Sequence, residues 1–332
     1  IVEFVEATAG KVAISYNQID PAQVQNDDII GGYSVSTHKT TGLELIDSVF
    51  PKYTIVPDII LCPNWSHDAE VAAVMSAKAE NINAVFEAMA ILDIDSAGED
   101  GVKWYTEAPN WKKKRNFTKD NEIVCWPKVK LGEKVFNLST QLAGSMTETD
   151  SKEDLGGGTP CESASNKSLQ ADGACLADKT EVLLDPEKGS YLNDNGIVTV
   201  LNFFNGFVSW GNYTAAFPSS TDPVEYFYCI NRMFKWVGKT AILSYWSHTD
   251  RKMVRRLLDA ILQGVNDWLN GLTAEERILG GRVEMREEEN SLTALMAGRV
   301  KFHIFITPPS PLQEMEFVIE YDVSYLTSLL VA

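Results

Sequence analysis

The sequence predicts two packed units: a middle α/β domain with a mostly parallel sheet, and a C-terminal α+β domain with helices packed on an antiparallel sheet. Residues 54–95 read as strand, crossover helix and strand, which is the βαβ pattern of a parallel sheet. Residues 222–271 carry two amphipathic helical stretches, and alternating strands follow at residues 299–307 and 314–323. The 332 residues are too many for one ordinary core, which also favours two domains.

Three segments follow from this pattern. Residues 1–26 read as a short strand pair and a polar linker, and we expect them to be the remnant of a preceding N-terminal segment, because the chain starts in a strand-like pattern without Met. Residues 27–176 form the middle domain, which closes with a long loop rich in Gly, Ser and Asp. Residues 177–332 form the C-terminal domain and end in a strand-like arm. Without its leading arm, this fragment is expected to be largely monomeric.

The middle domain is built around a buried strand and a helix. Residues 54–63 are a continuous β-branched apolar run closed by proline, typical of a strand buried on both faces. Ser66 is expected to cap the next helix, with Asp68 and Glu70 at the positive end of the helix dipole. Apolar residues then recur at spacings of three and four: Val71, Val74, Met75, Ile82, Val85, Phe86 and Met89.

The C-terminal domain has the clearest helix signals. Asp222 is suited to the N-cap and Pro223 to the first helical position, and Gly238 marks an end or kink. A second helix is expected to start at Thr249 and to end at Gly271. Each helix carries an apolar stripe, Tyr226, Ile230, Phe234 and Val237 in the first, and Met253, Leu257, Ile261, Val265 and Trp268 in the second.

Composition excludes two classes of partner. The formal net charge is −17, whereas a surface that reads phosphates needs clustered Lys and Arg, so no nucleic-acid partner is expected. The basic run at residues 111–115 is interpreted as a solvated loop. No apolar stretch approaches the ~20 residues that span a bilayer, so no membrane partner is expected either.

No stretch carries the residues of a familiar chemical site. A nucleophile elbow, Walker loop, HExxH motif and dinucleotide fingerprint are all absent from the sequence. Ser66, His67 and Asp68 are adjacent at a helix start, where the members of a triad rarely converge, and capping is the favoured interpretation. The acidic run at residues 287–290 lacks the spacing of an EF-hand loop. We therefore predict no catalytic, cofactor-binding or metal-ligating residues, no cofactor and no enzyme activity.

Several blocks in a fixed order resemble those of one family. They are GGYSVSTHKTTGLELID, PDIILCPNWS, LSTQLAGSMTETD, ESASNKSL, YLNDNGIVTV, WGNYTAAFPSSTD, INRMFKW and GGRVEMREEENSLTALMAGRVKFHIFITPPSPLQEMEFVIEYD. Together, over residues 31–322, the chain resembles the tail sheath proteins of contractile bacteriophages and of phage-tail-like bacteriocins. The chain departs from the family at Asn231, where a basic residue usually precedes Arg232.

The resemblance implies a structural subunit of a contractile tail sheath, made in the bacterial cytoplasm and built into the virion tail. Copies would polymerise around the tail tube, meet baseplate and terminator proteins, and contract to drive the tube through the target envelope without a cofactor. A sheath subunit of a bacteriocin or secretion-type apparatus is the alternative. An enzyme resembling α/β hydrolases is a remote third, because three converging catalytic residues cannot be named.

Two surfaces are predicted to assemble the sheath. In the family, arms from both chain ends lend strands to neighbouring subunits. Here residues 323–331 carry more apolar surface area than an isolated arm should expose to solvent. The predicted interface residues are therefore Val323, Tyr325, Leu326, Leu329 and Leu330. The preceding Phe317, Ile319 and Tyr321 alternate and are expected to bury against the domain's own helices. Lys252, Arg255 and Arg256 are the candidates for facing the tube, with a solvated helix face that pairs with nearby acids as the alternative.

Overall fold

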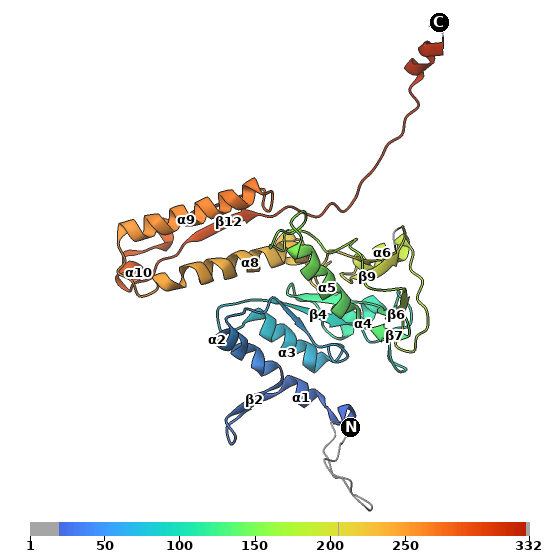
Figure 1. Cartoon of the computed structure of the whole chain (residues 1–332), viewed down its shortest axis with the longest axis horizontal. Helices are drawn as coiled ribbons and strands as arrows, with labels where there is room; N and C mark the ends of the chain where they lie inside the picture. The colour runs from blue at the N-terminus through green and yellow to red at the C-terminus, as the bar shows by residue number, and fades with distance from the viewer. Residues whose placement is uncertain (1–19, 205, 330–332) are drawn as a thin grey trace, which may run out of the picture.

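The structure is a computed structural model, and it describes residues 20–204 and 206–329. Short elements come first and lie beside the parallel sheet (Figure 1). They are η1 Pro21–Gln23, α1 Asn26–Ile30, the hairpin β1 Gly32–Ser34 and β2 Lys39–Thr41, η2 Gly42–Ser48 and α2 Val49–Tyr53. Most of the segment expected to be an N-terminal remnant, residues 1–19, lies outside the described residues.

A three-stranded parallel sheet organises the middle of the chain. Its strands are β3 Ile59–Leu61, β4 Met89–Asp93 and β5 Glu122–Cys125, in the order β3-β4-β5. Helix α3 Ala69–Glu80 makes the crossover from β3 to β4, so the predicted βαβ unit is confirmed. Every residue of β4 is buried because this central strand is covered on both faces.

The start of α3 differs from the expectation. Asp68 is the N-cap and accepts a hydrogen bond from the Glu70 amide at 2.9 Å, so Ser66 is not the cap. Ser66 is fully buried, and its hydroxyl accepts from the Asp93 amide at 3.1 Å. The cap therefore lies two residues later than predicted, because a contact distant in sequence occupies the serine hydroxyl.

Further elements complete this region. The antiparallel sheet has the order β7-β6-β8, from β6 Lys128–Leu131, β7 Lys134–Phe136 and β8 Gly173–Cys175, and β9 Thr199–Asn202 pairs with β10 Phe207–Trp210. The helices are α4 Ala108–Lys114, α5 Leu138–Ser151 and α6 Pro186–Asn193. The basic run read as a solvated loop is thus mostly helix α4, and its Lys112 is buried.

The hydrophobic cores continue across residue 176, where the sequence analysis places a domain boundary. Leu192 and Ile197 belong to the same buried cluster as Val71 and Leu92. The Val198 amide donates to the Val124 carbonyl at 2.8 Å, directly beside the end of β5. Residues that follow the long loop therefore complete the core around the parallel sheet.

The C-terminal region consists of two long helices and a β-hairpin (Figure 1). Its elements are α7 Pro223–Tyr226, α8 Tyr228–Tyr245, η3 Trp246–His248, α9 Arg255–Ala274, β11 Gly280–Glu284, η4 Glu287–Glu289, α10 Leu292–Met296, β12 His303–Thr307 and η5 Val323–Leu329. Strands β11 and β12 pair antiparallel, from Gly280 opposite Thr307 to Glu284 opposite His303. The inner face of the hairpin packs on α8 and α9 in a third hydrophobic core.

Three boundaries in this region were predicted wrongly. Gly238 lies inside α8, so the helix does not end at this residue. A glycine in a helix costs only about 1 kcal/mol, which the packing of the helix offsets. Helix α9 begins at Arg255, six residues after Thr249. Residues 314–323 were predicted to be a strand, but residues 308–322 form neither helix nor strand, and the partner of β12 is β11.

Candidate assembly site

The C-terminal arm leaves the body of the protein through a proline-rich root. Pro308 is buried, and Pro309 and Pro311 line a cavity of about 480 Å³ together with Trp210. The Tyr213 hydroxyl donates to the Gln313 side-chain oxygen at 3.3 Å. Proline fixes φ and removes the amide donor, so this root is stiff and is not available for sheet pairing. The direction in which the arm departs is thereby set by the body.

Beyond Gln313 the arm projects away from the rest of the molecule (Figure 1). Phe317, Ile319 and Tyr321 are 78%, 93% and 78% exposed, so the prediction that they bury against their own domain is wrong. Their alternation matches a strand that has no partner in its own chain. Residues 308–322 can span about 50 Å at ~3.3 Å per residue, well beyond the ~19 Å radius of gyration expected for a domain of this size.

The tip of the arm is the short 3-10 helix η5. Val323, Tyr325 and Leu326 are 65%, 76% and 48% exposed, so these predicted interface residues are accessible to another molecule. Leu329 ends η5, and Leu330 lies outside the described residues. An apolar segment held away from its own core is a typical site of protein–protein contact.

The β11–β12 hairpin offers open edges for such a contact. Among the described residues, these two strands form a sheet of their own, so each has one edge without a neighbouring strand. One face is closed by Val283, Ile304 and Ile306, which pack in the third core. On the other face Arg282 and Arg286 lie over the Phe305 ring at 4.3 and 5.0 Å. The open edges of the hairpin are the surface on which another strand can add.

The basic residues predicted to face the tube are at the start of α9. Lys252, Arg255 and Arg256 are all exposed, and Arg255 pairs with Asp259 at 3.4 Å. Lys252 precedes the helix, so it does not share a helical face with Arg256 as the sequence suggested. The Arg255–Asp259 pair matches the alternative interpretation, a solvated helix face that pairs with nearby acids, because Asp259 forms an ion pair with Arg255 within the same chain.

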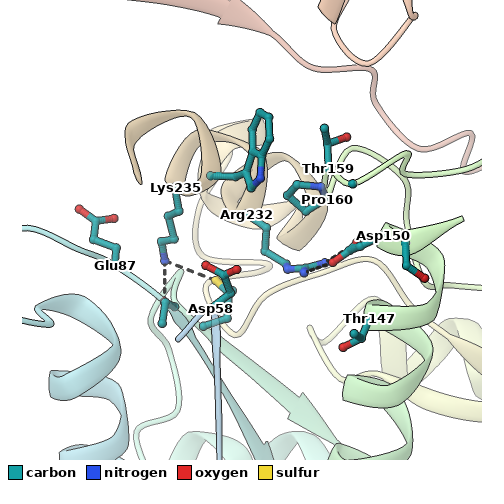
Figure 2. Close-up of a pocket in the computed structure, with 13 residues that line it drawn as sticks. Asp58, Glu87, Thr147, Asp150, Thr159, Pro160, Arg232 and Lys235 are labelled. Atoms are coloured by element: carbon teal, nitrogen blue, oxygen red, sulfur yellow. Dashed lines mark hydrogen bonds and ion pairs between the residues drawn. The ribbon is translucent and has the colours of Figure 1, made fainter. Parts of the chain in front are cut away.

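Sequence analysis missed a set of ion pairs that joins α8 to the parallel sheet. Arg232 makes a two-pronged pair with Asp150 on α5, and Lys239 pairs with Asp58 just before β3. Lys235 donates to the Ala88 carbonyl at 3.1 Å, and Figure 2 shows Arg232, Asp150, Asp58 and Lys235 around a cavity of about 260 Å³. The only sequence signal is basic residues spaced by three and four on an otherwise apolar helix.

These contacts of Arg232, Lys235 and Lys239, called the joint below, hold helix α8 against the middle of the molecule. The Arg232 side chain is only 7% exposed, and burial raises the pKa of the Asp150 carboxyl in spite of the neighbouring guanidinium. Burial likewise lowers the pKa of Lys235. Removing one partner of a buried pair leaves an uncompensated charge and costs about 3–5 kcal/mol.

A second buried polar cluster has no histidine in it. The Asp93 carboxylate accepts hydrogen bonds from the Ser139 hydroxyl at 2.6 Å, the Ser139 amide at 3.0 Å and the Ser66 hydroxyl at 3.3 Å. Burial raises the pKa of Asp93. In the described part of the chain no histidine bonds to this cluster. The three groups tie β4 to the starts of two helices.

Over the residues that the structure describes, no three His, Cys, Asp or Glu side chains gather closely enough to hold a metal ion. Across the same ranges, no helix combines the length and the apolar character needed to cross a membrane.

The curated proteins similar to this chain include tail sheath proteins. The tail sheath protein of Burkholderia phage BcepMu is 25% identical over 333 residues, covering 97% of this chain and 67% of the relative. A prophage major tail sheath protein of Pseudomonas aeruginosa (strain UCBPP-PA14) is 24% identical, covering 98% of this chain and 80% of the relative. Over nearly its whole length the chain is thus similar in sequence to tail sheath proteins. No family model matches this chain.

Solved structures show the same fold at low sequence identity. The sheath of the PVC extracellular contractile injection system, in its contracted state, has a TM-score of 0.67 and 14% identity, covering 86% of this chain and 76% of that one. The contracted helical sheath of the anti-feeding prophage (AFP) has a TM-score of 0.63 and 14% identity, covering 83% and 74%. The chain thus has the mixed α/β fold of contractile sheaths.

Proposed function

We propose that copies of this sheath protein polymerise in a helix around a tail tube and contract, driving the tube through the envelope of a target cell. The observation that carries the proposal is that one chain presents two complementary surfaces: an exposed apolar arm, and a β11–β12 hairpin with open edges. Among the described residues, the alternating segment of the arm pairs with no strand, and the hairpin has edges to which a strand can add. A repeating polymer satisfies both at every subunit.

The arm supplies the contact between subunits by adding a strand. When residues 314–322 pair with a neighbour's β11 or β12 edge, their amides and carbonyls gain partners, and Phe317, Ile319 and Tyr321 can bury on one face. Full burial of each such side chain contributes roughly 1.5–3 kcal/mol before ordering costs. The same contact recurs at each lattice position, so the polymer is strong although each contact is modest.

Contraction uses rigid bodies joined by flexible arms. The buried ion pairs at the joint keep each subunit body intact, while the arm beyond the proline root accommodates rotation between bodies. An extended sheath that is metastable relative to a contracted one with more buried surface needs neither ATP nor a cofactor. Accordingly, no enzyme activity is part of the proposed function.

The tube, baseplate and terminator proteins are the proposed partners besides other sheath copies. Exposed Lys252, Arg255 and Arg256 are the candidates for an electrostatic contact with an acidic band on the tube. The sequence relatives named above are phage and prophage proteins, which favours a phage tail. A bacteriocin-like or secretion-type particle is the second candidate, supported by the structural likeness to the PVC and AFP sheaths.

Electron microscopy of particles assembled by the full-length protein tests this function. Hollow cylinders that shorten and widen are the expected result. A protein that stays a small globule under every assembly condition, with its arm intact by mass spectrometry, would overturn the proposal.

A further inference from the structure

The C-terminal helices enclose a second hollow, which strand addition does not use. This groove has a volume of about 740 Å³ and lies between the end of α8, the start of α9 and the β11–β12 hairpin. Tyr245, Leu257, Ile261 and Phe302 are among the residues that line it. A mainly apolar hollow of this size falls within the ~300–1,000 Å³ range of sites that bind a compact apolar group.

Exposed apolar side chains lie on the elements that form or adjoin this groove. Met253 lines it and is 39% exposed. Trp246 at the end of α8, together with Leu292 and Met296 on α10, is 64%, 80% and 89% exposed. These elements meet at one end of the C-terminal region (Figure 1). Apolar side chains gathered around a groove are typical of a surface that is covered by another chain.

The arm tip has the shape and position for such a cover in a second copy. Residues 323–329 form a 3-10 helix, which cannot add to a sheet edge as a strand does. A short helix presenting Val323, Tyr325 and Leu326 is instead suited to a groove. The arm leaves the body at the end of β12, whereas the groove lies at the opposite end of the helices, and the arm extends away from it (Figure 1).

The charges of the two surfaces are complementary. Residues 314–322 carry four acidic side chains and no basic one. Residues 250–259 beside the groove carry four basic and two acidic side chains. Arg251 lines the groove itself, and Lys252, Arg255 and Arg256 lie next to it on the same segment. Opposite potentials steer encounter and fix orientation, which favours an acidic arm with an apolar tip as the occupant.

We propose that the groove between α8, α9 and the β11–β12 hairpin receives the helical arm tip, residues 323–329, of a second copy of this chain. This inference rests on the proposed function and adds a socket to it. Residues 314–322 add to a sheet edge, and the tip then locks into the groove beside that sheet. The socket distinguishes a correctly seated arm from one paired out of register, because only one register brings the tip to the groove.

Cysteine pairing between two differently substituted proteins tests the socket. Leu326→Cys places a thiol on the tip, and Met253→Cys places one at the groove. The two single variants are mixed under assembly conditions and oxidised, and the products are separated on a non-reducing gel and mapped by mass spectrometry. Because each protein carries one engineered thiol, an L326C–M253C disulfide joins two copies. Leu131→Cys, on β6 and 43% exposed, replaces M253C in the matched control mixture.

We expect at least about tenfold more L326C–M253C dimer than L326C–L131C dimer, since a docked tip raises the effective thiol concentration toward the millimolar range. Hollow cylinders in the microscope without an L326C–M253C link would overturn the socket and leave the proposed function standing. A link that forms only within a chain carrying both substitutions would also overturn it, because the tip would then occupy its own groove. Failure of the wild-type protein to form cylinders would instead refute the proposed function.

Discussion

Replacing Phe317, Ile319 and Tyr321 together by Ser should abolish sheath assembly without weakening the subunit. The three side chains are at least 78% exposed in the single chain, so the folded monomer loses almost no buried area. Surface changes of this kind alter the free energy of unfolding by about 0.5 kcal/mol or less. The melting temperature of the variant should therefore match that of the wild type.

The effect on assembly is far larger. If each side chain buries in a neighbour at roughly 1.5–3 kcal/mol, the triple variant loses on the order of 4–9 kcal/mol per contact before any gain in arm entropy. With a factor of ten for each ~1.4 kcal/mol, even the lower bound weakens the contact about a thousandfold.

Differential scanning calorimetry and sedimentation velocity measure the two quantities on the same sample. As a matched control, Glu316 and Glu320 are replaced by Asp and Asp322 by Glu, which alters the same arm while leaving both its apolar alternation and its negative charge intact. Assembly by the apolar variant at wild-type protein concentrations would refute the strand-addition model. A fall of the melting temperature by many degrees would show that the arm is part of the subunit's own core.

Three further changes probe the body and its charges. Replacing Arg232 by Ala should lower the free energy of unfolding by about 3–5 kcal/mol in urea titrations, because the change leaves a buried carboxylate without its partner; a loss below about 1 kcal/mol would contradict the proposed joint. The pKa of Asp47 is lowered below its usual 3.8, with hydrogen bonds from Lys78 and Asn83 outweighing burial. The contribution of the Asp47 carboxylate to the free energy of unfolding is present above that value and disappears as pH falls through the lowered folded-state pKa. Asp47→Asn should therefore lower the melting temperature at pH 7 and should melt with the wild type near pH 2. An equal difference in melting temperature at both pH values would contradict this. Reversing Arg255 and Arg256 to Glu should weaken co-sedimentation with tubes, most strongly at low salt, whereas Lys113→Glu on the distant helix α4 should not; equal losses from both would indicate a general charge effect.

Local patterns in the sequence determined the regular elements of the middle of the chain. The β-branched run before Pro63 and the three- and four-residue spacing from Val71 fix a strand and a helix, because period and propensity act over one element. The same holds for β12, whose residues alternate from His303 to Thr307. The order of the sequence blocks over residues 31–322 also indicated the resemblance to tail sheath proteins, since that order spans most of the chain.

Only the tertiary structure decided which groups meet. The hydroxyl of Ser66 could cap a helix or bond a strand twenty-seven residues away, and only the position of Asp93 selects the second. Arg232 and Lys239 form their ion pairs only because the fold brings Asp150 and Asp58 beside α8. The arm shows the same limit most clearly: its alternation specifies a strand to be buried, but burial requires a partner edge. Periodicity is a property of one segment, whereas burial and pairing depend on every segment that surrounds it.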